Sequence, residues 1–221
     1  MFSVAIDGPS GAGKSSIARR AAERLGFIYV DTGALYRTVG LAMSRKNTDL
    51  SNEKSVADLL NSIKVELTFK NGEQRVLLDG EDVSNDIRTP KASMMASKCS
   101  ALPAVRAFLL DLQRSMAKTS SIIMDGRDIG TVVLPDANVK IYLTASAEVR
   151  AKRRYDELVE KGHNVEFEDV LADMQKRDYD DMNRATAPLK QADDAVLLCT
   201  DDLSFEESIL AVLKIINGEQ K

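Results

Sequence analysis

Cysteine and histidine are scarce in this chain of 221 residues, which contains two cysteines and one histidine. Cys99 and Cys199 have neither the spacing of a zinc site nor the density of a disulfide-stapled secreted domain. His163 lies in a polar stretch between two helical patterns, where we expect it to be solvated. Because such cysteine usage is typical of a reducing compartment, we expect a cytoplasmic protein.

Long apolar runs and an excess of positive charge are also absent. The run Phe2–Ile6 stops at Asp7 and is too short for a signal peptide or a membrane span. The net charge of -4 provides no general field for a nucleic acid polymer. We therefore expect a soluble single domain, a monomer without membrane or nucleic acid partners, in which 44% hydrophobic residues supply the core.

Short apolar segments alternate with helical patterns along the chain. Strands are predicted at 2–6, 27–30, 120–124, 139–143 and 195–199, and the first two helices at 15–25 and 34–44. This alternation predicts an α/β fold with a five-stranded parallel sheet flanked by helices. Asp31, Asp125 and Asp128 follow or end predicted strands, at the sheet edge where such folds bind ligands.

One segment departs from this alternation. Residues 64–70 alternate polar and apolar, Asn71-Gly72 is typical of a type I′ turn, and residues 74–79 continue as a second strand. Asp79-Gly80 predicts a further turn towards Val83. The sequence therefore predicts a small antiparallel insert of two or three strands.

A phosphate-binding loop is predicted between the first strand and the first helix. The pattern Gly8-x-x-x-x-Gly13-Lys14-Ser15 turns backbone N–H groups towards phosphate oxygens at a helix N-terminus. Lys14 is expected at the β- and γ-phosphates of ATP, and the Ser15 hydroxyl at Mg²⁺. The expected ATP-binding residues of this loop are Gly8, Pro9, Ser10, Gly11, Ala12, Gly13, Lys14, Ser15 and Ser16. Ser16 also fits the surface of the helix.

The loop alone does not distinguish kinases from GTPases, motors and transporters. The guanine-recognition string Asn-Lys-x-Asp does not occur in the chain, and no repeats indicate a motor. A small-molecule kinase is therefore favoured. A non-catalytic, nucleotide-sensing protein remains the alternative, and it would bind ATP without transferring phosphate.

Single arginines near strand ends are candidates for holding a second anion. Arg37 and Arg127 follow Asp31 and Asp125, and Arg106 precedes a helical run. Arginine gives permanently charged, two-pronged contacts to phosphate. For each arginine separately, a solvated surface position is the alternative.

Two later helices carry further arginines at helical spacing. Ser146 is the predicted N-cap of a helix that ends at Gly162, and Arg150, Arg153 and Arg154 share one face of it. That face is expected to close over the transferring phosphates, unless it is an exposed surface paired with nearby carboxylates. In the next helix a stripe of Arg177, Asp181 and Arg184 suits a ribose and a phosphate, or else a structural ion-pair ladder.

With these motifs, the chain resembles the bacterial cytidylate kinases along essentially its whole length. The resemblance rests on Ile6–Lys14, Asp31–Arg37, Asp125–Val133 and Asn183–Ala185. It implies a P-loop NTPase fold and transfer of the γ-phosphate of ATP to CMP or dCMP, with Mg²⁺. It further implies a core of residues 1–31, 107–146 and 190–221, a CMP-binding region at 32–106 with an antiparallel insert at about 63–88, and a helical lid at 147–189.

The resemblance also implies roles for individual residues. Lys14, Arg127, Arg154 and Arg184 would be catalytic, and Arg153 and Arg154 would contact ATP. The CMP-binding residues would be Thr32, Arg37, Ser97, Arg106, Arg127, Asp128, Arg177, Asp181 and Arg184. Thr32 stands where the family has serine but keeps the hydroxyl group.

Recognition of cytosine has a simple chemical basis in this set. Cytosine offers an amino donor beside acceptor atoms, which the Asp128 carboxylate and the Arg106 guanidinium complement. Uracil presents a carbonyl to the same carboxylate, at a cost on the order of several kcal/mol. The sequence therefore predicts preference for CMP over UMP, but not the ratio of CMP to dCMP. No general base is assigned, because a loose transition state does not demand one.

Overall fold

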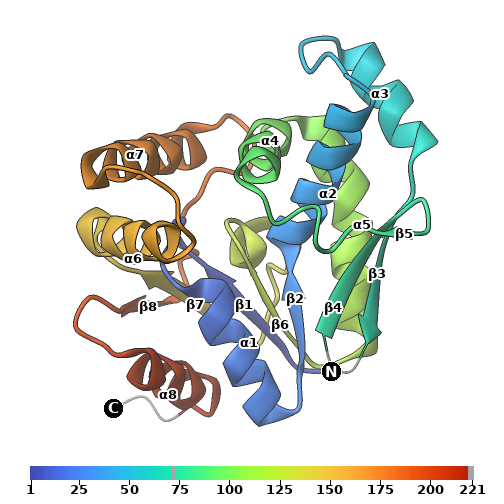
Figure 1. The fold of residues 1–221 in the computed structure, drawn as a ribbon. Coiled ribbons are helices and arrows are strands. Elements are labelled where there is room, and N and C mark those ends of the chain that lie inside the picture. Colours follow the sequence, from blue (N-terminus) through green and yellow to red (C-terminus); the bar gives the residue numbers. More distant parts are fainter. Residues whose placement is uncertain (71–72, 219–221) are drawn as a thin grey trace. The chain divides into compact units, whose positions relative to one another are not determined.

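The computed structural model describes residues 1–70 and 73–218 of the protein. The chain divides into two compact units. The sheet unit comprises Phe2–Tyr29 and Ser121–Lys221, and the insert unit comprises Val30–Ser120 with Met1. Figure 1 labels the helices and strands of both. Among the described residues, no helix has the length and apolar content that crossing a bilayer requires.

A five-stranded parallel sheet organises the sheet unit. Its strands run in the order β2-β6-β1-β7-β8, so that β1 pairs with β6 on one side and with β7 on the other. The strands are β1 (Ser3–Asp7), β2 (Ile28–Asp31), β6 (Ile122–Gly126), β7 (Val139–Thr144) and β8 (Val196–Cys199). The boundary between the two units falls within β2, after Tyr29. The predicted α/β fold is confirmed, and the strand bounds differ from the predicted ones by at most two residues.

Two helices pack together against this sheet, α1 (Lys14–Leu25) and α8 (Phe205–Ile216) (Figure 1). The buried stripe of α1 contains Ala18 and Ala21, whose small side chains allow a close approach to Val4 and Ile141 of the sheet. The helix ends at Gly26, as predicted, because glycine adopts the left-handed conformation there without strain (φ 66°). This packing holds the N-terminus of α1 at the end of β1.

Helices α6 (Ala147–Glu160) and α7 (Phe167–Asn183) lie side by side in the same unit (Figure 1). Ala151, Val170 and Met174 form their shared buried cluster. The predicted start of α6 is confirmed, since the Ser146 hydroxyl accepts a hydrogen bond from the backbone N–H of Val149. His163, in the connection between the two helices, is exposed as expected.

The insert unit combines four helices with a second, antiparallel sheet of order β3-β4-β5. Its elements are α2 (Thr32–Arg45), α3 (Glu53–Ser62), β3 (Val65–Lys70), β4 (Glu73–Leu78), β5 (Glu81–Asp82), α4 (Pro90–Ser100) and α5 (Pro103–Thr119). The predicted antiparallel insert is therefore confirmed in its three-stranded form. The predicted turn at Asn71-Gly72 lies outside the described residues.

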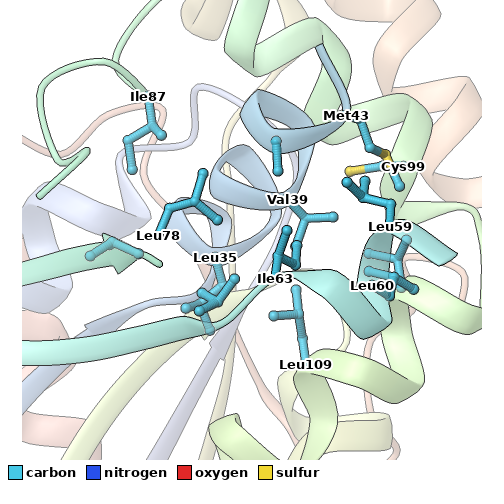
Figure 2. Packing of buried hydrophobic residues seen from close by; sticks show 14 of the residues in the cluster. Leu35, Val39, Met43, Leu59, Leu60, Ile63, Leu78, Ile87, Cys99 and Leu109 are labelled. Atoms are coloured by element: carbon cyan, nitrogen blue, oxygen red, sulfur yellow. The ribbon is translucent and has the colours of Figure 1, made fainter. Parts of the chain in front are cut away.

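The core of the insert unit lies around α2, whose Leu35, Val39 and Met43 are completely buried (Figure 2). Cys99 of α4 belongs to this core, and its thiol donates to the backbone carbonyl of Tyr36. Burial raises the pKa of the Cys99 thiol to about 12. Its role is therefore packing, because it stays protonated at neutral pH.

Candidate functional site

The loop between β1 and α1 has the backbone geometry of a phosphate cradle. Gly11 and Gly13 have φ angles of 76° and 87°, a region that favours glycine. Gly8 is required for space as well, since a Cβ atom there would lie 1.9 Å from the Leu143 carbonyl oxygen. Gly13 is the N-cap of α1 and has no side chain to accept from the first N–H groups. Those groups are available to an anion.

Lys14 is enclosed by the loop that precedes it. Its side chain is 5% exposed, and its ammonium group donates to the carbonyl oxygen of Pro9 at 2.6 Å. Burial lowers the pKa of Lys14 well below its ordinary value, and the Arg127 guanidinium lowers it further. The carboxylates of Asp125 and Asp7 oppose this shift. A bound polyphosphate would add further negative charge near this buried ammonium group and so favour its charged form.

Ser15 lies beside a carboxylate that the sequence did not assign to the metal. Its hydroxyl donates to Asp125 at 2.8 Å, and the Tyr29 hydroxyl donates to the other oxygen of that carboxylate, also at 2.8 Å. Hydroxyl and carboxylate oxygens are the hard ligands that Mg²⁺ prefers. In the described part of the chain no three His, Cys, Asp or Glu side chains gather as a metal site. The residues therefore fit a Mg²⁺ ion that takes its remaining ligands from phosphate and water.

Four of the predicted CMP-binding residues come together in the sheet unit. Arg127 pairs with Asp181 at 2.8 Å, and Arg184 lies 3.6 Å from Asp128 and 4.0 Å from Asp181. The side chains of Asp128, Asp181 and Arg184 are at most 8% exposed. This buried cluster contains two guanidinium groups that can present N–H donors to an anion. Arg177 is half-buried on α7, one turn before Asp181.

The three arginines of α6 contact different partners within the sheet unit. Arg150 is buried, donates to the Ser10 carbonyl at 2.9 Å and pairs with Asp178 of α7 at 2.7 Å. Arg153 donates to the Thr200 carbonyl. The half-buried Arg154 pairs with Glu157, a partner that the alternative interpretation expected of this face. Arg150 thus contacts the phosphate loop directly, although only helical spacing had singled it out.

In the insert unit, Arg37 and Thr32 lie in the first turns of α2. The Arg37 guanidinium pairs with Asp31 at 2.7 Å, and the same carboxylate caps α2 by accepting from the Ala34 N–H. The Gln74 side chain of β4 accepts from the Asp31 N–H and donates to the Asp31 carbonyl. Sequence reasoning missed Gln74, because nothing local relates it to a turn 43 residues earlier.

The two remaining predicted residues of the insert unit come from neighbouring helices. Ser97 is half-buried on α4. Arg106 of α5 is 8% exposed, donates to the Ser100 carbonyl and stacks over the ring of Tyr36 at 5.6 Å. The fixed plane of this guanidinium gives it a defined orientation for a planar partner.

Comparison with known proteins places the chain in one family. The family model for cytidylate kinase matches residues 4–218. The cytidylate kinase of Caldicellulosiruptor bescii is 47% identical over 214 residues, covering 97% of this chain and 95% of that protein. The cytidylate kinase of Thermosipho melanesiensis is 48% identical over 218 residues, covering 99% and 98% of the two chains.

The fold also has a counterpart among solved structures. An uncharacterized protein from Eubacterium ventriosum superposes with a TM-score of 0.52 at 13% identity, covering 98% of this chain and 99% of that one. At this identity the likeness concerns the fold alone. Because the family model spans nearly all of the sequence and the curated relatives share almost half of their residues with it, the chain belongs to the cytidylate kinase family.

Proposed function

We propose that this protein transfers the γ-phosphate of MgATP to CMP or dCMP, giving ADP and CDP or dCDP. The observation that carries the proposal is the buried Arg127, Asp181, Arg184 and Asp128 cluster, which belongs to the same unit as the phosphate loop. A kinase needs a cradle for the donor polyphosphate and permanent positive charge for the acceptor phosphate. The chain has both.

In the donor half of the reaction, the loop N–H groups and Lys14 hold the β- and γ-phosphates. Ser15 and Asp125 would hold Mg²⁺, whose charge offsets the negative charge of the phosphates. An oxygen of the acceptor phosphate forms the new bond to the γ-phosphorus, and the bond to the bridging oxygen of ADP breaks. Arg127, Arg184 and Arg154 would stabilise the charge that spreads over the transferred group.

In the acceptor half, Asp128 would accept from the exocyclic amino group of cytosine. Arg106 and Ser97 would complete recognition of the base, and Arg37 would hold the acceptor phosphate with Arg127. Thr32, Arg177 and Asp181 would address the ribose and the phosphate next to it. We also keep as proposals Arg153 as an ATP contact, the CMP-binding region at 32–106 and the lid at 147–189.

We further propose a monomer that works in the cytoplasm without a nucleic acid partner. The two free cysteines, Cys99 and Cys199, are consistent with a reducing compartment. Size-exclusion chromatography with light scattering tests the oligomeric state, and a dimer would contradict this part of the proposal.

An acceptor panel tests the proposed activity. ADP release is followed with CMP, dCMP, UMP, AMP, GMP and non-nucleotide alcohols, with ATP binding measured in parallel by calorimetry. CMP and dCMP are expected to support the fastest turnover. Turnover with another acceptor only would indicate a different small-molecule kinase, and ATP binding without any transfer would indicate a nucleotide sensor.

The Asp128→Ala variant tests recognition of the base. It is expected to lower kcat/KM for CMP on the order of 100-fold, because the amino group loses its buried acceptor, and to leave ATP binding unchanged. Asp193→Ala is the matched control, since this carboxylate belongs to the same unit and its side chain is 98% exposed. Equal loss of kcat/KM for CMP and UMP in Asp128→Ala would contradict a role in reading the base.

A further inference from the structure

Asp7 is a buried carboxylate that the proposed mechanism does not use. It is the last residue of β1 and immediately precedes Gly8, yet its side chain binds a segment more than 120 residues later in the sequence. Each carboxylate oxygen accepts one hydrogen bond of 2.7 Å, one from the backbone N–H of Ile129 and one from that of Gly130. Asp7 is only 4% exposed. Both carboxylate oxygens of Asp7 therefore form hydrogen bonds with this one segment.

The segment that Asp7 binds is η1 (Ile129–Val133), a single π-helical turn. It directly follows Arg127 and Asp128, the two residues that connect it to the end of β6 at Gly126. Both residues belong to the buried charge cluster. Asp128 is the N-cap of the turn, but its own side chain forms no cap hydrogen bond. Asp7 supplies the missing cap from another strand, and the Asp128 side chain is left to face Arg184.

The neighbouring atoms leave little freedom in this arrangement. A Cβ atom at Gly130 would lie 3.3 Å from the Asp7 carboxylate and 3.2 Å from the side chain of Lys140, so a glycine suits the close approach of the N–H group. A carboxylate suits Asp7 for a related reason. Both of its oxygens are acceptors, whereas an asparagine would turn its NH2 group towards one of the two N–H donors.

We propose that Asp7 is a positioning residue: it fixes the turn that directly follows Arg127 and Asp128, holds these two residues in place relative to the phosphate loop, and thereby sets the selectivity for cytosine over uracil. This inference rests on the proposed function, because it assigns Asp128 to the base. Asp7 itself touches neither reactant. It acts through the backbone of η1, where a small rotation would move the Asp128 carboxylate out of line with the exocyclic amino group.

Several ionisable groups surround Asp7 and influence its protonation state. Lys14 faces it from α1, Tyr142 and Lys140 from β7, and Asp128 from the start of the turn. Burial raises the pKa of Asp7 to about 6, and Asp128 adds to the rise, while the two backbone hydrogen bonds and Lys14 oppose it. The ionised carboxylate accepts a hydrogen bond from each of the two N–H groups, whereas a protonated oxygen is a weaker acceptor.

The Asp7→Asn variant is the first test, measured at pH 8 with CMP and UMP as acceptors. The ratio of kcat/KM for CMP to that for UMP is expected to fall about 10-fold, with the KM for ATP changed less than about twofold. Asn138→Ala is the matched control, because the Asn138 side chain accepts from the Ser3 N–H at the opposite end of β1 at 2.8 Å. It should leave the selectivity ratio unchanged.

A loss of activity that is equal for CMP and UMP in Asp7→Asn would overturn the proposal, since it would describe a merely structural residue. The wild-type protein provides a second test in case the variant fails to fold. Its amide proton signals of Ile129 and Gly130 should titrate with one shared midpoint near pH 6, together with a fall of the CMP to UMP ratio on the acid side. The ratio cancels ionisation of the acceptor phosphate, which both substrates share.

Amide signals that do not titrate together, or a ratio that stays constant across this range, would overturn the inference. These results differ from a failure of the proposed function, in which the wild-type protein would not phosphorylate CMP at all. An intact CMP kinase with an unchanged ratio in Asp7→Asn would contradict only the role of Asp7.

Discussion

The buried Asp7 carboxylate predicts how the stability of the protein changes with pH. Its pKa is raised from 3.8 to about 6 in the folded chain, chiefly by burial, so between these values the folded state binds more protons than the unfolded state. The free energy of unfolding therefore falls as pH rises through this window. A shift of about two pKa units, at about 1.4 kcal/mol each, corresponds to about 3 kcal/mol in full, of which about 2.4 kcal/mol is lost between pH 4 and pH 7.

The contribution of this one group is isolated by comparison with Asp7→Asn, which does not titrate. Urea unfolding followed by circular dichroism at several pH values gives the free energy of unfolding of both proteins. The wild-type value minus the variant value should fall by about 2.4 kcal/mol from pH 4 to pH 7. A difference that is constant across this range would refute the reasoning. It would mean that the two backbone hydrogen bonds and Lys14 fully offset the cost of burying the charge.

Three further substitutions test the phosphate loop and its surroundings. Gly8→Ala places a Cβ atom 1.9 Å from the Leu143 carbonyl oxygen. It should therefore lower the free energy of unfolding by about 3 kcal/mol or more in the same urea assay. An unchanged unfolding midpoint would contradict this close contact between Gly8 and Leu143. Lys14→Ala should lower kcat by about 100-fold or more with an unchanged circular dichroism spectrum, and retained turnover would argue against the loop assignment. Gln74→Ala removes two hydrogen bonds to the backbone of Asp31 and should raise the KM for CMP roughly 5- to 10-fold. The KM for ATP is the control, and an equal rise in both KM values would contradict a specific role of Gln74 in CMP binding.

Local sequence patterns were sufficient to predict much of the fold. Strand and helix periodicity, the glycines of the phosphate loop and the alternation in residues 64–79 each reflect interactions within a few residues of chain. They predicted the parallel sheet, the start of α1 and the antiparallel insert. The observed strand ends differ from the predicted ones by up to two residues, because they depend on which backbone groups form hydrogen bonds with the neighbouring strand.

The candidate site was predicted less completely, since its less obvious members are defined by contacts between distant residues. Asp7 holds a turn 122 residues away, Arg150 reaches Ser10 across 140 residues, and Ser15 meets Asp125 across 110. No local pattern encodes these pairs. The helical spacing of α6 predicted three arginines on one face, but it did not predict their partners, which lie in the phosphate loop, in α7, at Thr200 and within α6 itself.

Direct detection of phosphate transfer tests the central claim most closely. The protein is incubated with Mg²⁺, CMP and ATP labelled in its γ-phosphate, and the products are separated by chromatography. We expect the label to appear in CDP with an equal amount of ADP formed, and the rate with UMP to be far lower. Label found only in inorganic phosphate, or transferred to UMP as fast as to CMP, would contradict the account.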